Sequence, residues 1–589
     1  MSAIVRSPLP DVPIPSPQSF FQHYLPSKPR YSDYPAFIDG STGRTISGAQ
    51  LREDSLRLGK GLQKELQLSG HEETVAVIYS SNSVDFAQIF YGCQSVRIIT
   101  SLANASYTAA ELAHQLRDGD PAIAFVHPSN YEGYAGAIQM LNTEGRKEPQ
   151  LFWAVPLTDV PKTLRERTGV KSYQSLMVNT SDLDDFEGLS AEGEAAHQTA
   201  LLCYSSGTTG LAKGVMSTHH NLNVNGQISA LSWYPTNMVH GQPSVILGAC
   251  PWYHIYGLME AAVIPLLKGV PVVILPRFTP EGFFQAIHTH KITHAFVAPP
   301  MILHLANNSL ADKYDLKKLK WMRCAAAPLG RGLIKKVKSR LGDDVHITQG
   351  YGLTEVTCLC TAQTIEDAIS NPGSVGRLYP CLEAKIVDED FQPAKIGEPG
   401  ELCIRGATVM KGYWRNDEAT KASFTPDGWY RSGDIAHIDP KGHVYIVDRL
   451  KELIKYKGFQ VPPADLEKLL LTNPKVGDAA VIGVHSREHA TELPRAYVVP
   501  VGGLGALSEA GKAELATELV NWVEKNVANH KRLRGGCILV DAIPKSRLEK
   551  TEMLKHKFTS AAGKILRKQL RAMAKEQEAV QRQQTMAKL

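Results

Sequence analysis

The sequence lacks the features that mark several large classes of protein. Its most apolar stretch, residues 263–276 (VIPLLKGVPVVILP), is too short to cross a bilayer and is interrupted by Lys268, Gly269 and Pro271. We expect this stretch to form a buried pair of strands. The amino terminus is rich in proline and has no apolar segment of the secretory type. The sequence therefore predicts a soluble protein with no transmembrane segment.

Cysteine clusters and a strong charge of either sign are also missing. The nine cysteines are scattered, only Cys358 and Cys360 lie close together, and no spacing is that of a zinc site, which favours a reducing compartment. Lys and Arg number 64 against 59 for Asp and Glu, a formal net charge of +5. Spread over 589 residues, this surplus is too thin to indicate a nucleic-acid partner.

What the chain has is length and a regular alternation of short apolar runs with helix-like segments. A chain of 589 residues is expected to form two to four domains. Runs such as 74–80 (TVAVIYS) and 122–129 (AIAFVHPS) alternate with amphipathic segments, which favours parallel α/β layers. From about Gly373 the strands become shorter and richer in Gly and Pro, typical of a small distorted barrel. After residue 448 a small α+β pattern begins.

A segment rich in glycine and hydroxyl groups follows the apolar run 199–204 (TALLCY). It reads Ser205-Ser206-Gly207-Thr208-Thr209-Gly210-Leu211-Ala212-Lys213-Gly214. Its glycines let successive backbone N–H groups point inward as an anion nest, and Lys213 adds a charge suited to pyrophosphate. The spacing is not that of a Walker A loop. Because flexible linkers seldom follow a buried strand, the segment indicates a phosphate site.

This segment resembles the signature of the adenylate-forming superfamily, which includes acyl-CoA synthetases, luciferases and peptide-synthetase adenylation domains. Ala212 stands where that family usually has proline. Segments that resemble further family motifs follow in the family's order: 251–257 (PWYHIYG), 349–355 (QGYGLTE), 430–434 (YRSGD) and 447–449 (VDR). The best match, 448–461 (DRLKELIKYKGFQV), is most similar to the 4-coumarate–CoA ligase branch. Chance explains such an ordered series poorly.

The resemblance implies a fold and a reaction. The fold is α/β and multidomain. Residues 1–448 would form a large domain of two βαβαβ-like subdomains plus a small distorted β-barrel, and residues 449–589 a mobile small α+β domain that swivels about 448–451. The reaction would use ATP, Mg²⁺ and CoA to convert a small-molecule carboxylic acid, through an acyl-adenylate, into an acyl-CoA thioester.

The resemblance also implies roles for individual residues. Tyr351 would stack on adenine, Thr354 would contact phosphate, Glu355 would hold Mg²⁺, and Asp434 would accept hydrogen bonds from the ribose hydroxyls. The residues implied in binding ATP or AMP are Ser205, Ser206, Gly207, Thr208, Thr209, Gly210, Lys213, Gln349, Gly350, Tyr351, Gly352, Thr354, Asp434, Arg449, Lys455 and Gln460. Those implied in catalysis are Lys564, His254, Thr354 and Glu355, and those implied in binding CoA are Arg277, Lys457, Gly458 and Phe459.

The acyl pocket is implied to include His254, Tyr256, Ala325, Ala326 and Ala327. The small residues at 324–327 leave space for an aryl group or a chain of medium length, so both aromatic and fatty acids remain candidates. Within the superfamily, a luciferase-like oxygenase or a stand-alone adenylation enzyme would share these motifs.

The final family motif is interrupted here. Ile543-Pro544-Lys545-Ser546 and Gly563-Lys564-Ile565-Leu566 are each intact, but sixteen residues stand between them where two are expected. Loop closure costs little for a segment of this length, whereas a misplacement of ~1 Å at a reacting group can cost ~100-fold in rate. The extra segment near 547–560 is either a surface loop or an intron read through in the gene sequence. It leaves a pseudo-enzyme that only binds its ligands as a further alternative.

The last three residues, Ala587-Lys588-Leu589, are similar to the peroxisomal address that an import receptor reads at a free carboxyl end. We expect peroxisomal localisation, and a cytoplasmic location otherwise.

Overall fold

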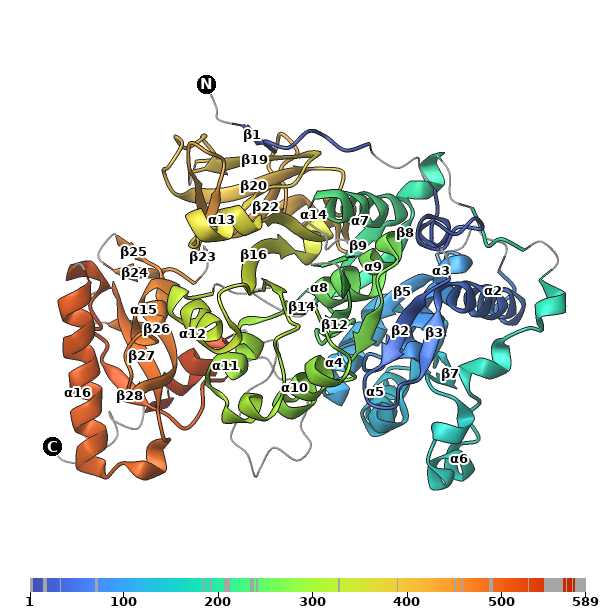
Figure 1. Ribbon diagram of the computed structural model, residues 1–589, viewed down its shortest axis with the longest axis horizontal. Helices are drawn as coiled ribbons and strands as arrows, with labels where there is room; N and C mark the ends of the chain where they lie inside the picture. Colours follow the sequence, from blue (N-terminus) through green and yellow to red (C-terminus); the bar gives the residue numbers. More distant parts are fainter. Residues whose placement is uncertain are drawn as a thin grey trace.

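The computed structural model describes the whole chain apart from several short stretches and one long one. These are residues 1–3, 14–17, 32, 69–72, 184–185, 191–192, 206–211, 233–237, 240–241, 327–328, 389, 450–451, 457–458, 487–490, 528, 545–564, 568, 575 and 578–589. The described chain forms two large sheets, a smaller antiparallel sheet and a carboxyl-terminal α+β unit (Figure 1).

The first large sheet has seven strands in the order β21-β9-β8-β5-β4-β6-β7. Its parallel centre consists of β4 (Val75–Tyr79), β5 (Ile99–Leu102), β6 (Ile123–Val126), β7 (Gln150–Trp153) and β8 (Thr199–Ser205). At one side of this sheet, β9 (Lys213–Thr218) and the edge strand β21 (Gly412–Tyr413) pair antiparallel. Every residue of β4 is buried, because helices cover both faces of a parallel sheet. The strands predicted at 74–80 and 122–129 are confirmed as β4 and β6.

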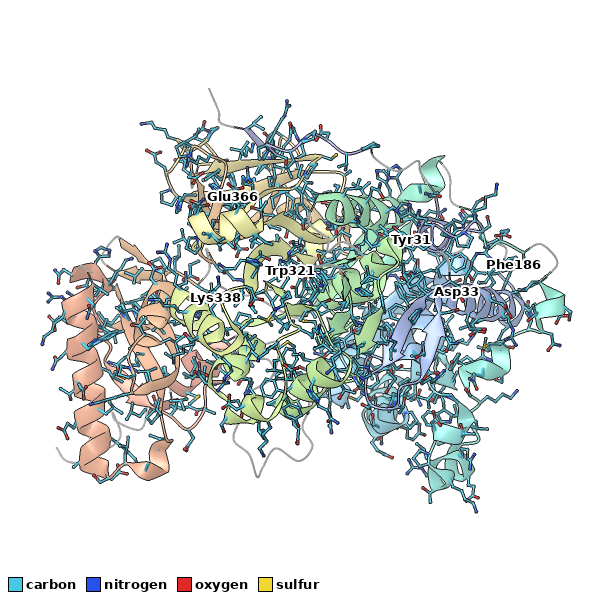
Figure 2. The ribbon with its side chains drawn as sticks, in the orientation of Figure 1. Tyr31, Asp33, Phe186, Trp321, Lys338 and Glu366 are labelled. Atoms are coloured by element: carbon cyan, nitrogen blue, oxygen red, sulfur yellow. The ribbon has the colours of Figure 1, made fainter. Side chains whose placement is uncertain are left out.

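The second large sheet has nine strands in the order β18-β17-β16-β15-β14-β12-β13-β2-β3. Parallel pairing joins β2 (Pro35–Asp39), β13 (Val272–Ile274), β12 (Ile246–Gly248), β14 (His294–Val297), β15 (Trp321–Cys324) and β16 (His346–Leu353). The strands β3 (Thr45–Ser47), β17 (Cys358–Ala362) and β18 (Arg377–Leu378) pair antiparallel at its two ends. Figure 2 shows Trp321, from β15, near the middle of the molecule.

Helices alternate with these strands, as the sequence pattern predicts. They include α2 (Gly48–Glu65), α3 (Val84–Ser95), α4 (Ala109–Gly119), α5 (Tyr131–Thr143), α7 (His219–Ser232), α10 (Pro280–Thr289), α11 (Pro299–Asn307) and α12 (Arg331–Leu341). Serine or threonine side chains cap the amino ends of α2, α3, α4 and α10, which satisfies N–H groups that the helix leaves without a partner. The expected α/β architecture of two layered sheets is therefore confirmed.

One local prediction is wrong. The stretch 263–276 is not a pair of strands, because its first half continues the helical segment 258–263 into α9 (Ile264–Lys268) and only β13 is a strand. Pro265 stands in the first turn of α9, where its missing N–H costs nothing, and Gly269 ends the helix at φ 63°. An apolar run of this length carries no period that separates a buried helix from a buried strand.

The smaller sheet is antiparallel and has the order β1-β19-β20-β22-β23. It comprises β1 (Val5–Arg6), β19 (Leu382–Val387), β20 (Gly400–Gly406), β22 (Tyr430–Ile438) and β23 (Val444–Arg449). Two helices, α13 (Ile365–Ser370) and α14 (Asp417–Ala422), lie beside it in Figure 1. Register shifts occur within β20–β22 and β22–β23, so the sheet is distorted as the Gly-rich composition predicts.

The carboxyl-terminal unit is a small α+β fold, as expected. A hairpin of β24 (Ile454–Tyr456) and β25 (Phe459–Val461) precedes α15 (Pro463–Leu470). A three-stranded sheet follows, with β26 (Val476–Ser486), β27 (Thr491–Pro500) and β28 (Cys537–Leu539), and α16 (Glu509–Asn526) packs against it. The apolar core of the large part ends at Val444 and that of the small unit begins at Ile454. The predicted boundary at 448/449 lies between them and stays a prediction.

The residues that the structure describes include neither a membrane-spanning helix nor a disulfide. Within the described ranges no helix combines the length and apolar character needed to span a membrane. All nine cysteines belong to the described residues and are free thiols.

Candidate active site

The glycine-rich segment leaves the first sheet at a hairpin. Antiparallel pairing joins β8 to β9, and its last matched pair is Ser205 opposite Lys213. Both ends of the phosphate-binding motif therefore lie side by side at the end of β8. The motif residues Ser206, Gly207, Thr208, Thr209 and Gly210 lie outside the described residues.

Glu355 is the point at which this hairpin meets the second sheet. It stands in the short helix Thr354–Val356 directly after β16, and it is 8 % exposed. Its Oε1 accepts hydrogen bonds from Ser205 Oγ at 2.9 Å and from the hydroxyl of Tyr413 at 3.0 Å. Lys213 Nζ lies 3.9 Å from the centre of the Tyr413 ring. The structure thus brings Ser205, Lys213 and Glu355 together, as the motifs predict, around one tyrosine.

Tyr413 was not predicted from the sequence. Burial raises the pKa of its hydroxyl, and the nearby Glu355 carboxylate raises it further, so the phenol stays protonated and donates to that carboxylate. Its ring also offers a negative face to the Lys213 ammonium. The GYW sequence that carries it (412–414) gave no signal by itself, because an aromatic next to glycine is common on edge strands.

A second set of polar side chains comes from β16, β22 and β23. The hydroxyl of Tyr351 donates to Asp434 Oδ2 at 2.6 Å, and Arg449 Nε lies 3.6 Å from Asp434 Oδ1. Asp434 and Arg449 face each other as a matched pair of β22 and β23. Burial, together with the Asp434 charge, raises the pKa of Tyr351 well above its usual range, so the phenol remains a hydrogen-bond donor. The sequence predicted each of these three residues, and the structure brings them together.

The loop from 349 to 358 is held in an unusual backbone shape. Gln349 accepts a hydrogen bond from the Leu329 N–H at 3.1 Å and donates to the Pro372 carbonyl at 3.0 Å, so it ties two loops to β16. Thr357 and Cys358 have φ values of 55° and 100°, a region that costs non-glycine residues about 1–3 kcal/mol each. A Cβ on Gly352 would lie 1.8 Å from the Cys358 carbonyl oxygen, whereas Gly350 is less tightly enclosed.

The predicted acyl-pocket residues lie around the end of β12 and β15. His254 Nδ1 accepts from the Tyr256 N–H at 3.4 Å and caps the short helix Ile255–Gly257. Tyr256 is buried, with its hydroxyl donating to the Arg323 carbonyl at 2.8 Å and its ring edge-on to Phe296 at 6.3 Å. Ala325 is buried, Ala326 is exposed at φ 74°, and Ala327 lies outside the described residues.

A buried charge pair near this tyrosine was missed by the sequence analysis. Glu260 and Arg323 are 0 % and 1 % exposed, and burial raises the pKa of Glu260 to about 7 against the opposing effect of Arg323. Arg323 Nη1 lies 3.3 Å from the Tyr379 hydroxyl, and its guanidinium stacks on Trp321 at 4.8 Å. Each residue occurs alone within an apolar run, so only the fold shows that their charges interact.

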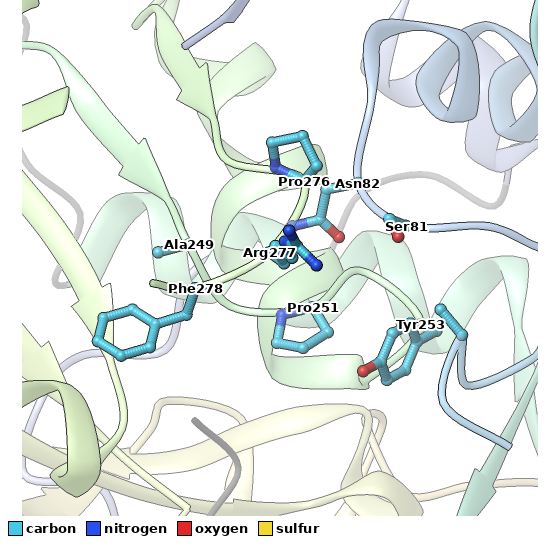
Figure 3. A pocket seen from close by; sticks show the side chains of 9 residues that line it. Ser81, Asn82, Ala249, Pro251, Tyr253, Pro276, Arg277 and Phe278 are labelled. Carbon is cyan, nitrogen blue, oxygen red and sulfur yellow. The ribbon is translucent and has the colours of Figure 1, made fainter. Parts of the chain in front are cut away.

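A pocket opens where strands of the two large sheets end (Figure 3). Arg277, predicted to bind CoA, lines it together with Ser81, Asn82, Ala105, Ala249, Pro251, Tyr253, Pro276 and Phe278. Asn82 shapes it, because its amide donates to the Cys250 and Leu275 carbonyls at 2.9 and 3.2 Å and accepts from the Trp252 N–H at 2.7 Å. Ligand sites of α/β proteins lie at such carboxyl ends of strands.

The carboxyl-terminal unit carries the remaining predicted residues, and the structure does not describe the side chains of most of them. Lys455 and Gln460 form a matched pair of the β24–β25 hairpin, and Phe459 belongs to the same hairpin, but their side chains are not described. Lys457, Gly458 and Lys564 lie outside the described residues. The Leu566 N–H donates to the Pro544 carbonyl at 2.8 Å. The described residues on either side of 545–564 are therefore joined by a hydrogen bond.

The donor set fits a magnesium ion carried by ATP. Among the described residues no group of three His, Cys, Asp or Glu side chains could hold a metal ion. A protein that binds Mg²⁺ together with substrate phosphates usually supplies one or two carboxylates. Phosphate oxygens and water complete the octahedral coordination of the ion. The carboxylate of Glu355 is the candidate for this role, and the hydrogen bonds from Ser205 and Tyr413 both use its Oε1.

We expect Gly352→Ala to destabilise the protein by about 3 kcal/mol or more, because the new methyl group would overlap backbone atoms that cannot rotate away. Gly330→Ala is the matched control, since a Cβ there meets nothing within 4 Å. Thermal and urea unfolding measure both. Equal midpoints for the two variants would contradict the close approach of Gly352 to Cys358.

Known proteins are similar to this chain over nearly its whole length. A family model described as AMP-binding enzyme matches residues 27–414, and one described as AMP-binding enzyme C-terminal domain matches residues 465–550. A protein named probable 4-coumarate–CoA ligase 1 from Dictyostelium discoideum is 34% identical over 565 residues, 95% of each chain. One named 4-coumarate-CoA ligase 1 from Narcissus pseudonarcissus is 32% identical, over 97% of this chain and 96% of its own.

Solved structures share the fold at lower sequence identity. The anthranilate CoA ligase AuaEII in complex with anthranoyl-AMP has a TM-score of 0.79 at 21% identity, covering 96% of this chain and 99% of its own. ATP-bound MatB from Rhodopseudomonas palustris has a TM-score of 0.75 at 24% identity, covering 94% and 98%. The multidomain α/β architecture predicted from the sequence is confirmed by these likenesses.

Proposed function

We propose that this chain, which belongs to the AMP-binding enzyme family and is an AMP-forming carboxylate–CoA ligase, activates an aromatic acid. We also propose a role in the reaction for each residue of the candidate site. The observation that carries the assignment of roles is the meeting of Ser205, Lys213 and Glu355 around Tyr413, beside the Tyr351–Asp434 pair. Tyr351 and Glu355, close together in sequence, thereby connect the residues that we assign to phosphate with the one that we assign to the ribose diol.

In the first step, a carboxylate oxygen of the acid attacks the α-phosphorus of ATP, and the bond to pyrophosphate breaks. Negative charge gathers on the phosphoryl oxygens in this transition state, so positive groups and N–H donors held in place stabilise it. Ser205 and Lys213 border the loop that would supply these donors. When bound, Mg²⁺ would supply further positive charge to the phosphates from Glu355. Lys564 would approach the reacting carboxylate.

We assign the binding of the nucleotide's ribose to Asp434. Its carboxylate is buried, is fixed by Tyr351 and Arg449, and offers two oxygens that suit a vicinal diol. Arg449 would compensate the charge of this carboxylate during binding.

In the second step, the thiol of CoA attacks the acyl carbon of the adenylate and AMP leaves. This step needs no triphosphate contact, so Lys564 is dispensable in it. Arg277 in the pocket at the strand ends, and Lys457, Gly458 and Phe459 of the small unit, are the residues we assign to CoA. We propose that the small unit, residues 449–589, turns about 448–451 between the two steps.

An aromatic acid is favoured by two considerations. Relatives that match nearly the full chain are named 4-coumarate–CoA ligases. The buried rings of Tyr256 and Phe296, edge-on at 6.3 Å, border the proposed acyl pocket and suit another ring.

We also propose import into peroxisomes through Ala587-Lys588-Leu589. Loss of Leu589 from a fluorescent fusion of the protein should abolish this import.

The test of the function is a panel of benzoic, phenylacetic, cinnamic and C6–C16 acids with ATP, Mg²⁺ and CoA. Release of pyrophosphate and AMP together with thioester formation, strongest with an aromatic acid, is the expected result. Preference for a fatty acid would overturn the proposed substrate, light emission would indicate an oxygenase, and the absence of pyrophosphate with every acid would indicate a pseudo-enzyme.

Asp434→Ala tests the ribose contact. We expect kcat/KM for ATP to fall about 100-fold, because loss of a buried acceptor of charged type costs about 3 kcal/mol in binding. With 2′,3′-dideoxy-ATP, which lacks the diol, kcat/KM of the variant should fall far less relative to the parent. A similar loss for both nucleotides, measured by pyrophosphate release, would argue against a role at the ribose.

Lys564→Ala tests the division between the two steps. Pyrophosphate release should drop by about 100-fold or more, since a positive charge is lost at the developing anion. Thioester formation from supplied acyl-AMP and CoA should stay near the parent value. Equal losses in both half-reactions would contradict the assigned role.

Removal of residues 547–560 tests the extra segment. Its flanking chain already closes through the Leu566–Pro544 hydrogen bond, so we expect the shortened protein to fold and its adenylation rate to be preserved or raised. A folded product with no pyrophosphate release, judged against circular dichroism of the parent, would show that the segment is required.

A further inference from the structure

One side chain, Tyr413, contacts both of the oppositely charged groups that we assign to the triphosphate. Its hydroxyl donates to Glu355 Oε1 at 3.0 Å, and its ring centre lies 3.9 Å from Lys213 Nζ. The first contact is a charge-assisted hydrogen bond and the second is a cation–π contact. Because the tyrosine is buried, water screens both contacts only weakly.

The main chain on each side of Tyr413 is tied to the segments that carry these two groups. The Met410 N–H donates to the Glu355 carbonyl at 2.8 Å. The Trp414 N–H donates to the carbonyl of Gly214, in β9, at 2.7 Å. Tyr413 is therefore held between the glycine-rich hairpin of the first sheet and the loop that follows β16 of the second.

The hydroxyl of Tyr413 fixes the orientation of the Glu355 carboxylate. A carboxylate that is 8 % exposed needs hydrogen-bond donors, and Ser205 Oγ also donates to Oε1, at 2.9 Å. Two donors on Oε1 favour Oε2 as the oxygen that would bind Mg²⁺. Groups that orient a metal ligand from outside matter for binding, because loss of one typically costs about 10–100-fold in metal affinity or activity.

The ring of Tyr413 gives the Lys213 ammonium a defined position. A lysine side chain is long and flexible, so its charge stays in one place only where a contact holds it. The π face attracts the ammonium without cancelling its charge, whereas a carboxylate partner would neutralise the charge that pyrophosphate requires. Through one tyrosine, an anion and a cation thus each keep their charge for the nucleotide.

We propose that Tyr413 is a positioning residue, which sets Glu355 and Lys213 at a fixed separation for binding the triphosphate together with its Mg²⁺. The inference rests on the roles proposed above for Glu355 and Lys213. Because the hydroxyl acts on the carboxylate and the ring acts on the ammonium, two substitutions of the same residue separate the two contributions.

Tyr413→Phe removes the hydroxyl and keeps the ring. Its affinity for ATP is measured by calorimetry without acid or CoA, once in excess Mg²⁺ and once in EDTA, and the ratio of the two affinities is the Mg²⁺ advantage. This advantage should fall about 10-fold, because the carboxylate loses a donor that orients it. Affinity in EDTA should stay within about twofold of the parent, since Lys213 keeps its ring. A variant that only loosened the fold would lose affinity in both conditions.

Tyr413→Leu removes the ring as well, so affinity for ATP in EDTA should also fall, several-fold below that of Tyr413→Phe. The matched control is Tyr204→Phe, which deletes a hydroxyl that donates to another carboxylate oxygen, Asp118 Oδ2, at 2.7 Å. This control should bind ATP as the parent does in both conditions. A loss of Mg²⁺ advantage in Tyr204→Phe equal to that in Tyr413→Phe would overturn the assigned role.

The route through Glu355 is tested by combining substitutions. In a Glu355→Gln background, Tyr413→Phe should change the Mg²⁺ advantage by less than about twofold, because the carboxylate through which it acts is gone. A loss as large as that in the parent background would show that the hydroxyl does not act through Glu355.

A readout without nucleotide separates this inference from the proposed reaction. Acetylation of Lys213 by acetic anhydride, followed by mass spectrometry, should be several-fold faster in Tyr413→Leu than in the parent, and parent-like in Tyr413→Phe. Equal rates in all three proteins would overturn the ring contact even if the parent bound no ATP.

The two affinities of the parent separate the remaining outcomes. A Mg²⁺ advantage that is present in the parent and unchanged in Tyr413→Phe would overturn the positioning role alone. A parent without any Mg²⁺ advantage would overturn the metal role proposed for Glu355, and the positioning role with it.

Discussion

The site depends on one buried carboxylate that joins separate sheets. Glu355 follows β16 of the nine-stranded sheet, yet its Oε1 accepts from Ser205 at the end of β8 and from Tyr413 in β21, both in the seven-stranded sheet. Its main-chain oxygen also accepts from the Met410 N–H at 2.8 Å. A carboxylate that is 8 % exposed must be compensated by donors, so these bonds fix the two sheets against each other at the place where the motifs converge.

The remaining polar groups extend from this junction along neighbouring strands. Asp434 and Arg449 are paired across β22 and β23, and Tyr351 reaches Asp434 from β16. The backbone at Thr357 and Cys358 stays in a costly conformation, which persists only where the surroundings fix it. Strain beside a set of fixed polar groups is typical of a site organised before its ligand arrives.

The small unit adds a second, separate constraint. Arg567 draws Glu452 and Glu467 into one buried ion cluster where the chain passes from one part to the other. Such clusters contribute little net stability, because desolvation offsets the attraction, but they specify geometry well. A hydrogen bond from the Leu566 N–H to the Pro544 carbonyl holds the chain next to Arg567 as well.

The sequence by itself determined the layered α/β architecture, the family and most of the polar residues of the site. Buried parallel strands such as Val75–Tyr79 carry an apolar signal of their own, and motif residues such as Asp434 and Glu355 stand in short patterns that the chain carries locally. Only the tertiary structure decided that 263–268 is helical and that Tyr413 lies under Lys213. It likewise showed that Glu260 lies near Arg323 and that Arg567 joins Glu452 and Glu467. Each of these facts depends on contacts between residues far apart in the chain, and a local pattern holds no information about which distant side chain will neutralise a buried charge.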